Sequence, residues 1–211
     1  MAIKPPVLPE NLPEVWIEGI IEEAREGVTG RAFMGGAMEN AAADVMDFSR
    51  CRFEGVKFGE CDIERVYFTD CHFVNCDLSG FILREGLVRR ASFERCRMVG
   101  THFDRMSLRD VAFDECQMDY AGFAECRIQD ARLRRCRARR AVFHSCEQKG
   151  LALESCDLTE FELIATRLDN VDLTTCELDG LRAAIELFHG ATIDLRQTPE
   201  LLALCGVKVR L

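Results

Sequence analysis

The residues of this sequence that are most often nucleophiles or metal ligands are its twelve cysteines. A zinc or iron–sulfur site would group thiolates at a short CxxC-like spacing, and the sequence contains no such pair. Their spacing in multiples of five instead predicts a regular structure that buries them as small apolar thiols, without a metal or other cofactor. Eleven of them fall at positions whose numbers end in 1 or 6: Cys51, Cys61, Cys71, Cys76, Cys96, Cys116, Cys126, Cys136, Cys146, Cys156 and Cys176.

The other residue types that support catalysis have no productive arrangement in the sequence. His72, His102, His144 and His189 lie far apart and lack the spacing of metal ligands. Carboxylates are abundant, but almost all occupy the polar positions of a repeat, so paired-acid catalysis has no specific support. No GxxxxGK[ST] phosphate-binding loop occurs. We therefore expect no catalytic residue and no enzymatic activity.

A five-residue repeat must position these side chains, because a large apolar residue recurs at positions ending in 3 or 8. From Phe48 to Leu178 only Ala138 and Gln148 break this rule, and no insertion shifts the frame. Neither the helical period of 3.6 nor the strand period of 2 gives such a pattern. Each pentapeptide is expected to form one side of a coil, with the large residue and the residue two before it pointing inward. Gln148 is expected to be a hydrogen-bonded defect in the core.

Similar residues also recur at steps of twenty, which predicts coils with four sides. One series of this kind is Phe33, Phe53, Phe73, Phe93 and Phe113. Stacked side chains of one shape pack without voids, and successive coils should lie about 4.8 Å apart. About seven coils would make a rod roughly 35 Å long. Thiols stacked at about this spacing lie outside the usual disulfide geometry, so we expect free cysteines.

Two segments show the repeat most clearly, Cys76-Asp77-Leu78-Ser79-Gly80 and Cys156-Asp157-Leu158-Thr159-Glu160. They resemble the pentapeptide-repeat family over roughly residues 48–180. The resemblance implies an all-β solenoid, a right-handed quadrilateral β-helix. We expect an N-terminal arm and capping helix over residues 1–30, the β-helix over residues 31–181, and a C-terminal cap or dimerisation segment over residues 182–211.

The open end of a solenoid exposes core and backbone, so a cap is expected at the N-terminal end. Residues 11–27 fit a capping helix, with Pro13 in its first turn and Gly27 at its end. An acidic partner-binding helix is the alternative reading. The apolar stripe expected to cover the first coil is Trp16, Ile17, Ile20, Ile21 and Ala24.

The repeat loosens after Leu181, where a second cap is expected. Thr198-Pro199 indicates the start of a helix that ends at Gly206, and residues 207–209 read as a short final strand. In family members that protect type II topoisomerases from quinolones, the C-terminal ends join two rods, so the resemblance also implies a homodimer. The residues expected to form the cap or the dimer contact are Leu201, Leu202, Leu204, Val207 and Val209.

A dense arginine band interrupts the acidic chain, whose formal net charge is −9. The band consists of Arg127, Arg132, Arg134, Arg135, Arg137, Arg139 and Arg140. Acids in neighbouring coils could neutralise it: Glu115, Asp119, Glu154, Asp157 and Glu160. A weakly charged side lies nearby, with Gly122, Ala124, Val142, Ile164 and Ala165 pointing outward. We predict that the protein-binding residues are Arg132, Arg134, Arg137, Arg139, Val142 and Ile164.

These features favour a non-enzymatic scaffold that binds another, undefined protein. The resemblance implies an alternative, a DNA-mimicking protein that binds and protects or inhibits DNA gyrase or topoisomerase IV, because a rod bearing carboxylates can imitate the charge of duplex DNA. The arginine band and the unbroken frame, which leaves no room for projecting loops, weaken this alternative. Residues 1–12 do not resemble a signal peptide and no apolar stretch could span a bilayer. We therefore expect a cytoplasmic protein that contacts neither membrane nor nucleic acid directly.

Overall fold

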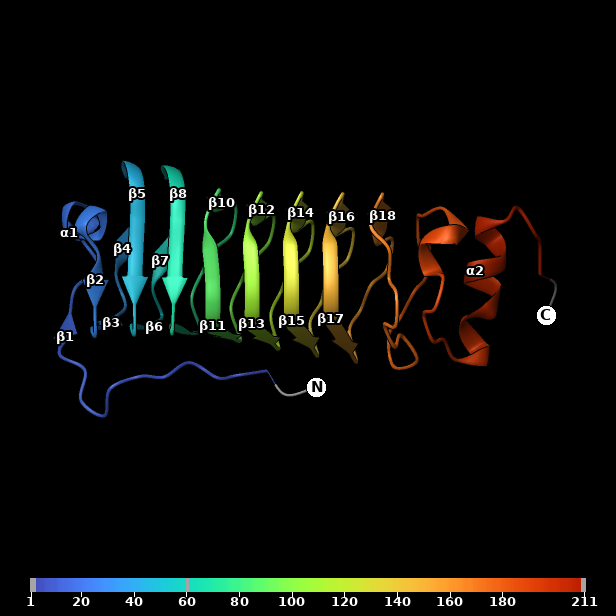
Figure 1. Ribbon diagram of the computed structural model, residues 1–211, viewed down its shortest axis with the longest axis horizontal. Coiled ribbons are helices and arrows are strands. Elements are labelled where there is room, and N and C mark those ends of the chain that lie inside the picture. Colours follow the sequence, from blue (N-terminus) through green and yellow to red (C-terminus); the bar gives the residue numbers. More distant parts are fainter. Residues whose placement is uncertain (1–2, 60, 210–211) are drawn as a thin grey trace.

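A computed structural model describes residues 3–59 and 61–209. The chain forms a right-handed, four-sided parallel β-solenoid of about 8 turns, which confirms the fold expected from the repeat. Figure 1 shows the turns stacked along one axis, with an extended arm beneath them and helices at the C-terminal end. The rod has one coil more than the repeat count suggested, because β2 (Val28–Thr29) already pairs with β5 (Ala42–Ser49).

Each coil contributes five residues to each of four sides. In one central coil side I holds residues 86–90, side II 91–95, side III 96–100 and side IV 101–105, and each side recurs every twenty residues. Strands of eight residues cross from side IV to side I in β5 and in β8 (Asp62–Thr69). Strands of the same length cross from side I to side II further along: β11 (Leu87–Glu94), β13 (Ser107–Asp114), β15 (Arg127–Arg134) and β17 (Glu147–Glu154).

The remaining strands are short and stay on one side. Side II carries β3 (Ala32–Met34), β6 (Arg52–Glu54) and β9 (His72–Val74), with β1 (Glu14–Val15) paired to β3. Side IV carries β10 (Ile82–Arg84), β12 (His102–Asp104), β14 (Gly122–Ala124), β16 (Val142–His144) and β18 (Glu162–Ile164). Side III carries β4 (Ala37–Met38) and β7 (Lys57–Phe58), then single parallel bridges such as Arg97 to Gln117.

The core consists of stacked columns of the inward residues. On side II the rings of Phe53 and Phe73 stack with centroids 4.6 Å apart, and those of Phe93 and Phe113 with centroids 4.9 Å apart. Gln148 is the hydrogen-bonded defect that the frame predicted, since its Nε2 donates to the carbonyls of Arg167 and Asp169 at 3.2 and 3.1 Å. The inward frame is therefore confirmed.

The thiols lie inside the coils as expected, with one exception. Ten of the eleven repeat cysteines are buried, and burial raises the pKa of the Cys51 and Cys71 thiols. Several donate to the carbonyl oxygen twenty-three residues earlier, as Cys71 does to Phe48 at 3.4 Å. The expectation was wrong for Cys61, which is only partly buried because it lines a depression left by the small side chains of Ala41 and Ala42.

The corners between sides require an unusual backbone conformation. Most residues of the coils at positions ending in 0 or 5 have positive φ, including Arg90 (48°), Tyr120 (59°) and Ser145 (52°), and glycine takes this place at Gly80 (70°). This left-handed conformation costs a side-chain-bearing residue about 1–2 kcal/mol. The solenoid therefore meets a small conformational cost at each such corner and offsets it with the parallel hydrogen bonds of the coils.

The N-terminal cap is shorter than the sequence suggested. Helix α1 spans only Ile21–Glu26, and Trp16 is 72% exposed rather than part of the apolar face. Residues 14–15 instead pair with β3, so their backbone groups belong to the sheet and cannot enter a helix. The helix ends at Gly27, whose φ is 101°. The buried side chains that do cover the first coil are Ile17, Ile20 and Ala24, and Ile21 packs against the same core while partly buried.

The C-terminal end is closed by two short 3-10 helices, Ile185–Phe188 and Leu195–Gln197, followed by α2 (Thr198–Leu204). Gln197 ties them to the last coil, since its buried Nε2 donates to the carbonyls of Leu173 and Cys176 at 2.7 and 2.6 Å. The strand expected over residues 207–209 is absent, because no neighbouring strand reaches this end to pair with it.

Candidate protein-binding surface

The structure places the six predicted binding residues on three successive sides of the rod. Arg132 and Arg134 lie on side II and Arg137 and Arg139 on side III, with a corner at Arg135 between the two pairs. Val142 and Ile164 lie on side IV in neighbouring coils. Each pair therefore shares a side, but the six residues curve around the rod and do not share one flat face.

Most of the arginine band is paired with carboxylates one coil away, as the frame allowed. Arg134 contacts Asp114, and Arg135 bridges Asp114 and Glu115 at 3.0 and 2.9 Å. The remaining ion pairs are Arg127–Glu147 at 3.6 Å, Arg137–Asp119 at 2.6 Å, Arg139–Asp157 at 2.5 Å and Arg140–Glu160 at 2.9 Å. The coil length of twenty residues explains this arrangement, because it sets side chains of consecutive coils side by side.

These pairs affect the titration of their acidic members. The Arg134 guanidinium lowers the pKa of Asp114, and the Arg140 guanidinium lowers the pKa of Glu160. The carboxylates therefore stay charged and paired at neutral pH. Exposed pairs of this kind contribute only about 0–1 kcal/mol each, so their main effect is to neutralise the surface.

Arg132 differs from the rest of the band because it has no ion pair among the described residues. It lies on β15 between Ala112 of β13 and Ala152 of β17. The methyl groups on both sides provide no acceptor, and the Arg132 Nε is shielded from solvent without a hydrogen-bond partner in the described chain. The sequence pattern that indicates this isolation is the pair of alanines twenty residues before and after Arg132, which the expected pairing of the band with acids did not take into account.

The apolar part of the predicted surface is modest. Ile164 is 41% exposed, whereas Val142, which pairs with Glu162 in the strand register, is half-buried. His144 pairs with both Ala124 and Ile164 in the strand register and so interrupts the apolar strip. The strip is therefore too small to act as a binding site alone.

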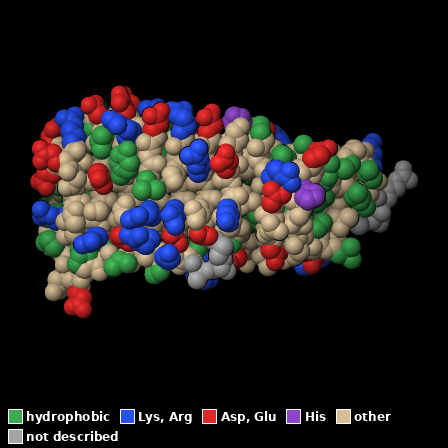
Figure 2. All heavy atoms as spheres, in the orientation of Figure 1, with side chains coloured by type: hydrophobic (Ala, Val, Ile, Leu, Met, Phe, Trp, Pro, Cys, Tyr) green, Lys and Arg blue, Asp and Glu red, His purple; other side chains and the backbone are tan. Residues whose placement is uncertain are grey.

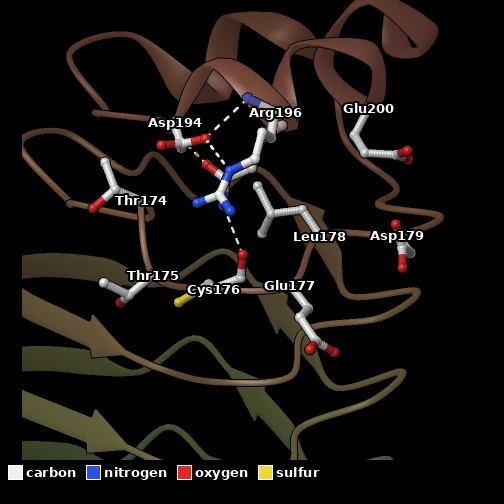
Figure 3. Close-up of a pocket in the computed structure, with 10 residues that line it drawn as sticks. Thr174, Thr175, Cys176, Glu177, Leu178, Asp179, Asp194, Arg196 and Glu200 are labelled. Atoms are coloured by element: carbon white, nitrogen blue, oxygen red, sulfur yellow. Dashed lines mark hydrogen bonds and ion pairs between the residues drawn. The ribbon is translucent and has the colours of Figure 1, made fainter. Parts of the chain in front are cut away.

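A cleft of about 340 Å³ lies between the last coil and the C-terminal helices. Figure 3 shows Asp194 and Arg196 above it, paired at 2.7 Å, and Glu177, Asp179 and Glu200 at one side. Within the described residues, no group of three or more His, Cys, Asp or Glu side chains could hold a metal ion. The cleft is the seam between rod and cap, without an arrangement that suggests catalysis.

The visible face of the rod carries charges of both signs. Figure 2 shows Lys and Arg side chains interspersed with Asp and Glu along its length, rather than a continuous acidic strip. Among the described helices, none has the length and apolar character needed to cross a membrane.

Comparisons with known proteins agree with this architecture. Residues 87–163 match the family description "Pentapeptide repeat region", and residues 44–80 match "Pentapeptide repeats (9 copies)". No curated protein matches the sequence.

Two solved structures share the fold at low sequence identity. QnrB1, a plasmid-mediated fluoroquinolone resistance protein, is 20% identical, with 86% of this chain and 91% of that chain covered and a TM-score of 0.54. HetL from the cyanobacterium Nostoc sp. strain PCC 7120, involved in heterocyst differentiation regulation, is 14% identical, with 85% and 91% covered and a TM-score of 0.52.

Proposed function

This chain belongs to the pentapeptide-repeat family, and we propose that it is a non-enzymatic scaffold that binds another protein through side chains displayed on the rod. Its fold is similar to those of QnrB1 and HetL, as expected for a rigid interaction scaffold. The proposed contact residues are Arg132, Arg134, Arg137, Arg139, Val142 and Ile164.

One observation supports this proposal above the others, namely the unpaired guanidinium of Arg132. The other band arginines have their charge neutralised by acids of adjacent coils, whereas Arg132 lies between two alanines. An arginine at such a position can form a charge-assisted hydrogen bond with a partner carboxylate without first breaking an internal pair. The partner is therefore expected to present an acidic side chain to side II.

The DNA-mimic reading has less support from the geometry. A mimic of duplex DNA needs carboxylates that are free to meet the basic surface of a topoisomerase. In the middle of this rod Asp114, Asp119, Asp157 and Glu160 are instead engaged by arginines. Binding to DNA gyrase or topoisomerase IV is kept as the alternative function, and a cytoplasmic location remains a prediction.

Charge reversal at Arg132 tests the proposal without breaking an ion pair. We expect Arg132→Glu to abolish capture of the protein partner while the thermal unfolding midpoint stays unchanged. Arg97→Glu is the control, because Arg97 is an exposed, outward arginine of side III that, like the half-buried Arg132, has no ion pair among the described residues. Equal capture by both variants would contradict the proposal. Inhibition of gyrase supercoiling by the purified protein, unchanged by Arg132→Glu, would favour the DNA-mimic alternative.

We also propose that two copies associate through the C-terminal end. Leu201 and Leu204 pack against the core and act as the cap, whereas Leu202, Val207 and Val209 are 36%, 47% and 41% exposed. Exposed apolar side chains gathered at one end of a rod are typical of a contact surface.

A further inference from the structure

The N-terminal arm lies outside the coils and follows the edge between sides I and II. Figure 1 shows it running beneath the rod from β1 back toward the middle of the molecule. Residues 3–9 contain Pro5, Pro6 and Pro9, and none of them belongs to a helix or strand. Prolines favour the extended polyproline II conformation, which has no internal hydrogen bonds.

Two buried carboxylates on this edge accept hydrogen bonds from the arm backbone. The Lys4 N–H donates to Asp110 Oδ1 at 3.1 Å, and the Val7 N–H donates to Asp70 Oδ1 at 3.0 Å. Asp110 and Asp70 are only 5% and 4% exposed, although both are corner residues. Burial raises the pKa of Asp70, but hydrogen bonds from Arg90 and from the Val7 N–H lower it overall, so this acceptor is ionised at neutral pH.

The spacing of these contacts matches two regular repeats. Asp70 and Asp110 are two coils apart, which is about 9.6 Å. Lys4 and Val7 are three residues apart, which is about 9.3 Å in polyproline II. Pro5 and Pro6 fill the interval without an N–H that would need an acceptor. An extended segment with donors on either side of two prolines therefore fits the corner ladder in register.

The arm does not fill the groove in which it lies. A cavity of about 220 Å³ remains between residues 3–6 and the side II residues that include Ala112, Arg132 and Arg134. Val7 is 63% exposed. The arm therefore leaves space beside it, and its two contacts to the rod carboxylates use backbone N–H groups that any segment of the same spacing also carries.

We propose that the edge between sides I and II is a binding site for an extended, proline-containing peptide segment of a partner protein, and that the arm is its built-in, displaceable occupant. The two carboxylates of the site accept hydrogen bonds from backbone N–H groups three residues apart, so a segment that lacks these N–H groups does not bind. The site adjoins Arg132 and Arg134, which line the same cavity, but it binds through the corner carboxylates Asp70 and Asp110 and does not rest on the function proposed above.

The probe for this site is a fluorescein-labelled peptide with the sequence of residues 3–9. The host is the full chain carrying Lys4→Pro and Val7→Pro, which removes both arm donors while leaving the coils untouched. We expect this host to bind the peptide at least ten-fold more tightly than the unaltered chain in fluorescence anisotropy. A peptide with proline at the same two positions should not bind.

The corner provides a matched pair of host variants. Adding Asp110→Gly removes one acceptor, and glycine is compatible with the positive φ of 54° at this position. Asp130→Gly changes the next corner residue in the same column, which has φ of 56° and no hydrogen bond to the described arm. Peptide binding should be lost with Asp110→Gly and kept with Asp130→Gly. No gain in the arm-disabled host, or equal binding by the two glycine variants, would overturn the proposal.

A second measurement uses the unaltered chain, so its outcome does not depend on how the variants fold. The amide protons of Lys4 and Val7 should exchange slowly with solvent, and excess unlabelled peptide should accelerate their exchange. Exchange that peptide does not change would show that the arm is a fixed strap. Concentration-dependent dimers that lose these amide contacts on dilution would show that the occupant is the arm of a second copy, which would also overturn the proposal.

Discussion

The twelve cysteines show how strictly the repeat assigns environments to single residues. Ten thiols are buried in the inward columns, Cys61 is partly exposed beside a depression, and Cys205 is exposed just after α2. Burial also raises the pKa of Cys71 well above the ordinary thiol value, which lowers the fraction of reactive thiolate at neutral pH.

Thiol labelling of the native protein should therefore occur in distinct phases. We expect rapid modification of Cys205, slower modification of Cys61, and reaction of the other ten only after unfolding in denaturant. Cys205→Ser should remove the fast phase and leave the rest unchanged. Rapid labelling of three or more thiols in the folded protein would show that the inward columns are assigned incorrectly.

Among the structural elements, the corners link the sequence repeat to the shape of the coil. At most corners the chain turns through a left-handed conformation, so the side chain at such a corner must tolerate positive φ. Residues that are branched at Cβ tolerate positive φ least.

Ser145→Val tests the corner geometry. Ser145 has φ of 52°, and its N–H donates to the carbonyl of Ile164 at 2.8 Å. We expect the valine to lower the free energy of unfolding by about 1–2 kcal/mol in urea denaturation. His144→Val is the control, because His144 lies outward on β16, where a valine suits the strand. Equal stability of the two variants would contradict the corner assignment.

The sequence predicted these coils well because their rules are local and repeated. Phe53, Phe73 and Phe93 stack as a twenty-residue step requires, and the five-residue frame identified the inward positions. The ends were predicted less well. Pairing of residues 14–15 with β3 shortened the first helix, and the lack of a neighbouring strand left residues 207–209 unpaired. Those outcomes depend on contacts between distant segments, which a periodic pattern does not encode.

The candidate site was predicted in part for the same reason. The band and its acidic neighbours follow from the frame, and the ion pairs of Arg137 and Arg139 agree with that expectation. Arg132 lacks an ion pair because Ala112 and Ala152 lie beside it. These alanines become its neighbours only when the residues of adjacent coils are aligned. The arm groove could not be found from the repeat, because residues 3–9 lie outside it.

At the scale of the whole molecule, the rod has one arm-covered edge and one exposed apolar end. Association of two copies through that end predicts a dimer in sedimentation velocity. Val207→Asp should convert it to a monomer, because a carboxylate would be buried in the contact. Ile164→Asp, a change at a similarly exposed position on side IV, should leave the dimer intact. A monomer of the unaltered protein at high concentration would refute the proposed association.

Side II around Arg132 is central to the proposed scaffold function, and site-specific photo-crosslinking tests it most directly. A photoreactive residue replaces Ala152, the neighbour of Arg132 on β17, and in a second preparation replaces Gln129 on side I. We predict a protein adduct from position 152 that disappears when Arg132→Glu is added, and no such adduct from position 129. The absence of a protein adduct from position 152, or an adduct that persists with Arg132→Glu, would contradict the account.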